Sequence, residues 1–273
     1  MDRVSFKIFP ILVVLLAATT TARADRWDFL PSQVLFEPLI ADLREVQNGV
    51  IAQPDENHYD GAIGLDIDFI HWQPNETDHW GWGINGGTFI ELDSLGDAAF
   101  PDRVSDWYFG TYFIEKTGPL SHRLEFEHVS SHLGDDNLLF EFIPHIIYSR
   151  ESLRYTLSYD FSESFRLFGG PCYWSHLSPD TADPRFFFQG GAEVYSSYMK
   201  FFFETQVRGY ATYFIEVLGE AGGTVDQTVQ LGLQYKWKKD THQAIRTALI
   251  LYTGKSLYGQ FYQNPESYWG LGI

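Results

Sequence analysis

The chain has 273 residues, a formal net charge of −17 at neutral pH and one cysteine, Cys172. This acidic balance argues against nucleic acid as a partner, because phosphates need basic surfaces. A single cysteine excludes an internal disulfide. Aromatic residues make up 17% of the chain, which suits the aromatic girdles found at the two surfaces of a membrane.

Residues 1–24 have the layout of a secretory signal peptide. Arg3 and Lys7 precede an apolar run, and Ala22 and Ala24 frame a cleavage site ahead of Asp25. The apolar run is too short to cross a bilayer, so it indicates export rather than a helical anchor. We therefore expect residues 1–24 to be removed and the rest of the chain to leave the cytoplasm.

Residues 25–58 differ in character from the rest of the exported chain, because Pro31, Pro38 and Pro54 interrupt any regular element there. We interpret this segment as a periplasmic lead-in or a partial plug. Nothing in the remaining sequence marks a linker or a repeat, so residues 59–273 are expected to form one β-barrel domain.

From about residue 61 onward, apolar and polar residues alternate with the period of a β-strand. In Thr224–Trp237, for example, Val229, Leu231 and Leu233 share one face and Gln230 lies on the other. In lipid every backbone polar group must be paired, which leaves helices and closed barrels as the spanning structures. The pattern predicts an all-β, antiparallel transmembrane β-barrel with apolar faces outside and charged faces inside. A soluble exported β-sandwich, with the opposite orientation, is the alternative.

We expect about twelve strands, an even number as in bacterial single-chain barrels. They are predicted near residues 61–72, 79–92, 105–115, 121–130, 138–149, 152–162, 164–175, 184–195, 197–209, 224–237, 242–253 and 266–273. Long connections, which normally face the cell exterior, are expected at 176–183, 210–223 and 254–265. The connection 93–104 is also long, but this count of strands puts it on the periplasmic side.

Four stretches resemble a known bacterial family. They are Phe29–Glu45, Glu127-His-Val-Ser-Ser-His-Leu-Gly-Asp-Asp136, Tyr252–Tyr262 and Tyr268–Gly272. In this order and spacing they resemble the family catalogued as domain of unknown function 1207. The resemblance spans nearly all of the exported chain. It implies an uncharacterised envelope protein in the form of an outer-membrane β-barrel, and it carries no assigned activity.

The densest polar cluster is His128 to Asp136. His128 and Ser130 are two residues apart on a predicted strand and continue the lipid-facing row of Leu124 and Phe126. This arrangement resembles the His-x-Ser motif of outer-membrane phospholipases, in which a histidine activates a serine nucleophile. By analogy Ser130 would attack an acyl ester and His128 would take its proton. No asparagine that could orient the histidine is evident on a neighbouring strand, so these two residues stand as catalytic candidates only.

Two other interpretations compete for the same cluster. His132, Asp135 and Asp136 are candidate binding residues, and His128, His132 and Asp135 have side chains that suit zinc. The alternative is a tight turn, in which Gly134 supplies an unusual backbone angle and Asp135 caps nearby amides. We favour the turn, and we expect no cofactor and no metal.

Charged residues on the opposite faces of the strands could line a narrow pore or fill the interior with ion pairs. They are Arg123, Glu125, Glu127, Arg154, Asp160, Arg166, Lys200, Glu204 and Arg208. The sequence therefore predicts a bacterial outer-membrane barrel with a structural, binding or narrow-pore role. Its expected partners are the lipid bilayer, lipopolysaccharide and the barrel-assembly machinery; a lipid acyl hydrolase is the alternative.

Overall fold

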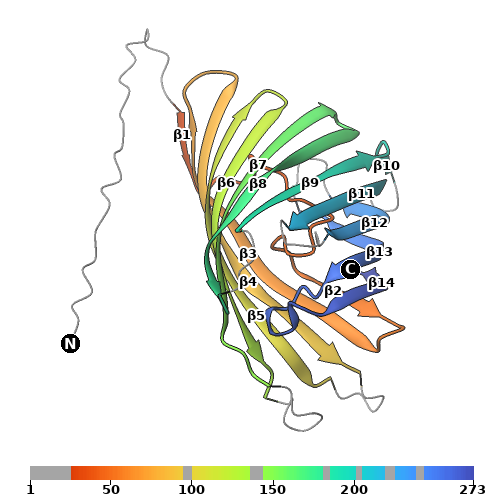
Figure 1. Cartoon of the computed structure of the whole chain (residues 1–273). Coiled ribbons are helices and arrows are strands. Elements are labelled where there is room, and N and C mark those ends of the chain that lie inside the picture. The colour runs from red at the N-terminus through yellow and green to blue at the C-terminus, as the bar shows by residue number, and fades with distance from the viewer. Residues whose placement is uncertain are drawn as a thin grey trace, which may run out of the picture.

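The protein is a closed antiparallel β-barrel of 12 strands (Figure 1). The computed structural model describes residues 26–94, 100–135, 144–180, 185–200, 205–218, 225–237 and 243–273. The barrel strands are β2 (Gly49–Gln53), β3 (His58–Gln73), β4 (Asp78–Asp93), β5 (Asp102–Thr117), β6 (Leu120–Leu133), β7 (Tyr148–Ser162), β8 (Phe165–Ser178), β9 (Phe186–Tyr195), β11 (Gln206–Leu218), β12 (Val225–Lys236), β13 (Ile245–Lys255) and β14 (Pro265–Gly272). The predicted signal peptide lies outside the described residues.

Each barrel strand pairs with its neighbours in sequence, and the ring closes where β14 pairs with β2. Among the described residues, the ladder of this closure pairs Leu271 with Ala52 and Gly272 with Ile51, and Val50 and Ile273 exchange two backbone hydrogen bonds beyond it. Two short strands lie on the edges of others: β1 (Arg26–Phe29) pairs with the far end of β3, and β10 (Met199–Lys200) pairs with β11. A short 3-10 helix, η2 (Gly259–Phe261), lies between β13 and β14.

The alternating rows place their apolar side chains on the outside of the barrel and their polar side chains inside. On β12, Leu231 and Leu233 are 49% and 42% exposed on the outer wall, whereas Gln230 and Gln234 are 5% and 4% exposed inside. A β-sandwich would bury the apolar row and expose the polar row. The prediction of an antiparallel barrel is therefore confirmed, and the two-sheet alternative is wrong.

The number of strands was predicted correctly through two errors that cancel. The strand predicted at 138–149 is wrong, because β7 begins at Tyr148 and pairs directly with β6, while 144–147 form no strand. Pro144 has no amide hydrogen to donate to a ladder; residues 138–143 lie outside the described part. The missed strand is β2, which has only 5 residues and lies within the segment interpreted as a lead-in.

Correcting these two strands reassigns the ends of the barrel. The β4–β5, β6–β7, β8–β9 and β13–β14 connections now share one end, which we call the long-connection end. The tight turns 74–77, 118–119 and 163–164 share the other, the short-turn end. The long connection near 93–104 thus lies with the other long ones, and the discrepancy in the sequence-based count disappears.

The predicted division between strand and loop around residue 210 is also wrong. The strand predicted at 197–209 is divided between β10 and the start of β11, and β11 continues through most of the loop predicted at 210–223. Gly209 and Ala211 occupy outward positions of β11 and weaken the apolar row there. The small side chains hid the strand because periodicity is detected only where the side chains on the two faces differ.

The interior of the barrel contains its own apolar core. The chain between β1 and β2, residues 30–48, runs inside the barrel (Figure 1); we call it the lumen segment. Its Leu35, Phe36 and Leu39 pack in one buried cluster with Tyr112 and Phe168 from the inner wall. The wall thus has apolar side chains on both faces at this level, which explains why strict alternation fails in places.

Among the described residues, no helix is both long and apolar enough to cross a membrane.

Candidate functional site

Three strands on one side of the barrel bind the backbone of the lumen segment. The amide of Ile40 donates to Glu193 Oε1 at 2.9 Å, and Gln230 Nε2 donates to the Ile40 carbonyl at 2.9 Å. Arg166 donates to the carbonyl of Glu37 at 2.8 Å and to that of Pro38 at 3.2 Å. Buried backbone groups need such partners when they are not part of a helix or sheet. β8, β9 and β12, which lie within four consecutive strands of the wall, therefore hold the segment on one side.

Ion pairs fix the second half of the lumen segment. Arg123 on β6 makes two parallel hydrogen bonds to Glu45, of 2.6 and 2.9 Å. Arg154 on β7 lies 3.3 Å from Asp42. Burial raises the pKa of the Asp42 carboxyl, although Arg154 acts in the opposite direction. Both pairs place opposite charges in contact away from water. Removing either partner would leave the other charge buried without compensation and would destabilise the fold.

The inward charges predicted from the sequence fall into two groups. Arg123, Glu125, Glu127, Arg154 and Arg166 take part in interior ion pairs. Lys200 is instead exposed on β10, and Glu204 lies outside the described residues. Arg208 lies over the Tyr195 ring and donates to Gln234. Of the two possibilities for these charges, the first group therefore fills the interior.

Three of the four stretches that carried the family resemblance meet at one buried carboxylate, Asp106 on β5. Asp106 forms an ion pair with Arg44 and accepts hydrogen bonds from Ser131 Oγ and from the Gly259 amide, the latter at 3.1 Å. The Gln260 amide donates to Ser131 Oγ at 3.0 Å. We call these five residues the Asp106 cluster. It ties the lumen segment, the end of β6 and η2 together.

Glycine is required at position 259 by close packing. A Cβ atom there would lie 2.3 Å from the Tyr148 ring and 2.6 Å from Ser131 Cβ. Asp106 lies in none of the four family stretches, so it did not stand out in the sequence. The available signal was a carboxylate in the inward row of β5 between Val104 and Tyr108.

The catalytic candidates His128 and Ser130 lie on the outer wall, near the long-connection end of β6. Both continue the outward row of the exposed Leu124 and Phe126, and Ser131 beside Ser130 is buried on the inner face. No hydrogen bond joins them within the described residues. His128 faces Glu151 of β7 directly across the ladder, with 3.8 Å between His128 Nδ1 and Glu151 Oε1. The resemblance to phospholipases calls for an asparagine that orients the histidine, so the glutamate at position 151 did not stand out in the sequence. We call His128, Ser130 and Glu151 the outer-wall cluster.

The candidate binding residues do not form a common site. His132 is exposed on the outer wall, Asp135 is exposed beyond the end of β6, and Asp136 lies outside the described residues. Within the described ranges, no group of three or more His, Cys, Asp or Glu side chains is arranged to hold a metal ion.

The explanation expected for Gly134 is wrong in its geometry. Gly118 is the one glycine with a positive φ in the described chain, so Gly134 does not supply an unusual angle. A Cβ on Gly134 would instead lie 1.9 Å from the Asp102 carbonyl oxygen. Close approach of β5 to the end of β6 therefore requires the glycine.

Fold and interior together define a closed antiparallel barrel with an internal segment bound across its lumen. The family model described as "Protein of unknown function (DUF1207)" matches residues 13–273. The chain therefore belongs to the DUF1207 family, as its four sequence stretches predicted. No curated protein matches the chain, and no solved structure does.

Proposed function

We propose that the protein is a β-barrel of the bacterial outer membrane, exported by residues 1–24 and inserted by the barrel-assembly machinery. The observation that carries this proposal is the orientation of the side chains. A wide outer band of apolar side chains is exposed, including those of Leu65, Phe126, Leu153, Leu231 and Leu249. In contact with water, such an apolar surface would be energetically unfavourable, whereas lipid or lipopolysaccharide chains would cover it.

Exposed aromatic residues near both ends of the strands support the same location. Trp80, Phe161 and Trp237 lie toward the short-turn end, and Trp107 and Phe186 lie toward the long-connection end. Rings of this kind occupy the two interfaces of outer-membrane barrels. By the usual rule that long loops face the cell exterior, the long-connection end would be extracellular.

Among structural, binding and pore roles, the lumen segment favours a barrel that does not conduct at rest. Its ion pairs and hydrogen bonds reach β5, β6, β7, β8, β9 and β12. A segment held at so many points cannot swing aside without breaking several buried contacts.

Two measurements test this proposal. The refolded protein should need detergent to stay in solution and should float with liposomes, because its outer wall is apolar. In a planar bilayer the wild type should give no discrete conductance steps, whereas deletion of residues 31–47 should give them. A wild type that stays monomeric in plain buffer would contradict the membrane location, and stepwise conductance by the wild type would contradict the closed lumen.

A second function, hydrolysis of a lipid acyl ester, is favoured by one specific contact, that between His128 and Glu151. A carboxylate beside Nδ1 of a histidine can hold the ring so that Nε2 acts as a base. Ser130 Oγ would attack the ester carbonyl while His128 takes its proton and then passes it to the departing alcohol. Water would cleave the acyl-serine in the second half of the reaction, with His128 again as base. At the long-connection end, the cluster would face the outer leaflet.

The hydrolase proposal predicts fatty-acid release from phospholipid or lipid A by the refolded wild type. Ser130→Ala should abolish release, and Glu151→Gln, which removes a positioning carboxylate, should lower kcat by roughly tenfold or more while shifting its pH profile. Ser149→Ala is the matched control, since Ser149 pairs directly with Ser130 on the same face. Equal activity of wild type and Ser130→Ala, or none in either, would rule the hydrolase out.

A further inference from the structure

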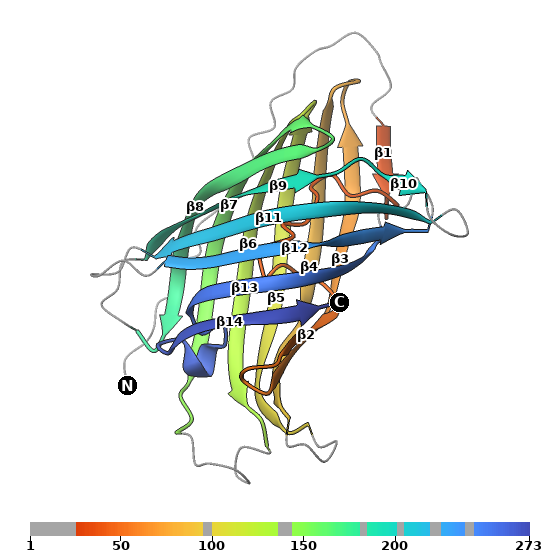
Figure 2. The same ribbon diagram turned by 90° about the vertical axis from the view of Figure 1, so that its right-hand side faces the viewer.

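The wall of the barrel is incomplete beside its closing strands. β2 covers the edge of β3 only at His58–Ala62, and β1 covers it only at Ile70–Gln73. Along the described chain, the edge between these two stretches faces no strand. Across the gap, β14 stops pairing with β13 at Ala248, so Ile245–Thr247 extend past it. Figure 2 shows β14 ending beside β2, with β13 and β12 continuing above it.

A cavity of about 620 Å³ lies at this gap, within the size range of sites for small molecules. Its lining includes Gln230, Arg246 and Ile250, which face the lumen, and also Val50 and Ile63, which are exposed on the outer wall. Because side chains from both faces of the wall line one cavity, the cavity joins the outer surface to the lumen through the side of the barrel.

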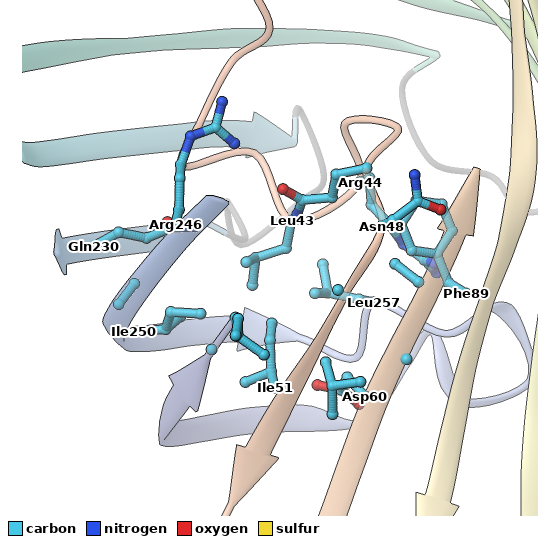
Figure 3. A pocket seen from close by; sticks show the side chains of 18 of the residues that line it. Leu43, Arg44, Asn48, Ile51, Asp60, Phe89, Gln230, Arg246, Ile250 and Leu257 are labelled. Carbon is cyan, nitrogen blue, oxygen red and sulfur yellow. The ribbon is translucent and has the colours of Figure 1, made fainter. Parts of the chain in front are cut away.

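The lining is apolar over much of its extent and ionic at two separate places. Leu43, Ile51, Ile250 and Leu257 gather between the strands (Figure 3). Asp60 lies on one side of this group, where it accepts a hydrogen bond of 2.9 Å from Tyr258 Oη. Its carboxylate would repel an anion there.

Arg246 lies on the opposite side of the apolar group from Asp60 (Figure 3). Its Nε atom is buried and has no hydrogen-bond partner within the described residues. No carboxylate of the described residues forms an ion pair with it. Elsewhere in the interior, Arg44, Arg123, Arg154 and Arg166 each pair with a carboxylate, whereas Arg150 and Arg208 lie over aromatic rings. Arg246 is half-buried, and of the two arginines in the lining it is the one that forms no ion pair within the described residues, so it is the group in this cavity suited to a negatively charged ligand.

Two more cations strengthen the positive potential near Arg246. Arg208 and Lys236 lie over the same ring, that of Tyr198, at 4.8 and 5.9 Å. Gln234, which pairs with Arg246 on the neighbouring strand, accepts from Arg208. The chain as a whole has a net charge of −17. The cavity nevertheless has a positively charged side at Arg246 and a negatively charged side at Asp60.

We propose that this cavity binds an amphiphile with one acyl chain and an anionic headgroup, which enters sideways from the bilayer. The headgroup would lie on Arg246 and the chain between Leu43, Ile250 and Leu257. The side opening favours this occupant over a water-soluble anion, because the outer end of the cavity lies in the apolar band of the wall. The inference rests on the proposed membrane location for the route of entry, but not for the binding itself.

The experiment measures displacement of a fluorescent fatty acid from the full-length refolded protein in a neutral detergent. Palmitate and palmitoyl-lysophosphatidylglycerol should displace the probe, whereas hexadecanol and zwitterionic palmitoyl-lysophosphatidylcholine should do so far less well. Competition by palmitate alone would mean a carboxylate ligand, and competition by both would mean that any anionic headgroup is accepted. Either result supports the site.

Matched variants make the test specific. Arg246→Gln should weaken palmitate binding by about tenfold, the loss expected for one charged hydrogen-bonded contact. Arg185→Gln, which changes an exposed arginine paired with Asp180, should leave binding unchanged. Ala248→Phe should block the cavity and abolish binding; circular dichroism would verify that each variant is folded.

Three outcomes overturn the inference: no saturable binding by the folded wild type, equal competition by hexadecanol and palmitate, or unchanged affinity in both Arg246→Gln and Ala248→Phe. Flotation with liposomes is scored separately. A protein that floats but does not bind palmitate keeps its proposed location and loses this site. A protein that binds palmitate but remains soluble without detergent keeps the site and loses the location.

Discussion

Among the described residues, arginines that face the lumen have carboxylate partners on one side of the barrel and lack them on another. Along β5 to β9, the inward Arg123, Arg154 and Arg166 meet carboxylates of the lumen segment or of the wall, and Arg150 lies over aromatic rings. Beside β13, Arg246 has no such partner among the described residues, and the wall next to it is open. Paired charges therefore identify the part of the interior that is structural. The unpaired charge identifies the part where the chain is suited to bind something else.

The largest effect is expected on the paired side. Arg123→Met should lower the free energy of unfolding by about 3–5 kcal/mol, because it leaves Glu45 buried without its partner. The double variant Arg123→Met, Glu45→Leu should recover most of the loss, since it removes both charges. Urea unfolding of the refolded barrel in detergent measures both values. If the single and double variants are equally unstable, the pair is not what holds the segment.

A smaller effect is expected in the Asp106 cluster. Gly259→Ala should destabilise the barrel by about 1–3 kcal/mol, the usual cost of overpacking, because its Cβ would meet the Tyr148 ring at 2.3 Å. Gly118→Ala is a useful contrast, since nothing lies within 4 Å of its Cβ and its cost comes only from a φ of 57°. Loss of protease resistance in η2 for Gly259→Ala alone would link the effect to this contact.

The paired side should also respond to pH through Asp42. Burial raises the pKa of this carboxyl above its unfolded value, so the folded state holds the proton more tightly than the unfolded state. Its contribution to stability is complete below the unfolded pKa and is lost as the pH rises through the folded pKa. Asp42→Asn should therefore flatten the pH dependence of unfolding above about pH 4, the range in which an unfolded aspartate has lost its proton. An identical profile for wild type and variant would contradict this.

The smallest effect on stability is expected at the open side. Arg246→Gln should change the free energy of unfolding by no more than about 0.5 kcal/mol, and in the stabilising direction, because it removes a half-buried charge that has no ion-pair partner among the described residues. Compared with Arg123→Met in the same assay, it tests the contrast between the two sides directly. A loss as large as that of Arg123→Met would mean that Arg246 is structural too.

The sequence predicted the features that repeat along the chain. Alternation in stretches such as 224–237 and 121–130 gave the strands, their long axes and the faces that point outward. It failed where a strand was too short to show a period, as in β2, and where small side chains hid the period, as at Gly209 and Ala211. It also failed where an apolar run contained a proline, as in 138–149.

The interior could not be predicted in the same way, because its contacts join residues far apart in sequence. Asp106 contacts Arg44 and Gly259, and no local pattern connects those positions. Glu151 faces His128 only because β7 follows β6 directly, which the false strand at 138–149 concealed. In the sequence nothing distinguishes Arg246 from the other arginines of the strands; its place at the cavity and the lack of an ion pair among the described residues appear only in the structure.

The proposed membrane location requires the outward rows to lie in lipid, and spin-label accessibility tests this most directly. In a Cys172→Ser background reconstituted into liposomes, labels at Leu231→Cys and Leu249→Cys should be reached by oxygen and not by a water-soluble nickel complex. A label at Glu56→Cys, in an exposed turn, should show the reverse. If the nickel complex reaches Leu231 and Leu249 as readily as Glu56, the apolar band lies in water and the membrane location is wrong.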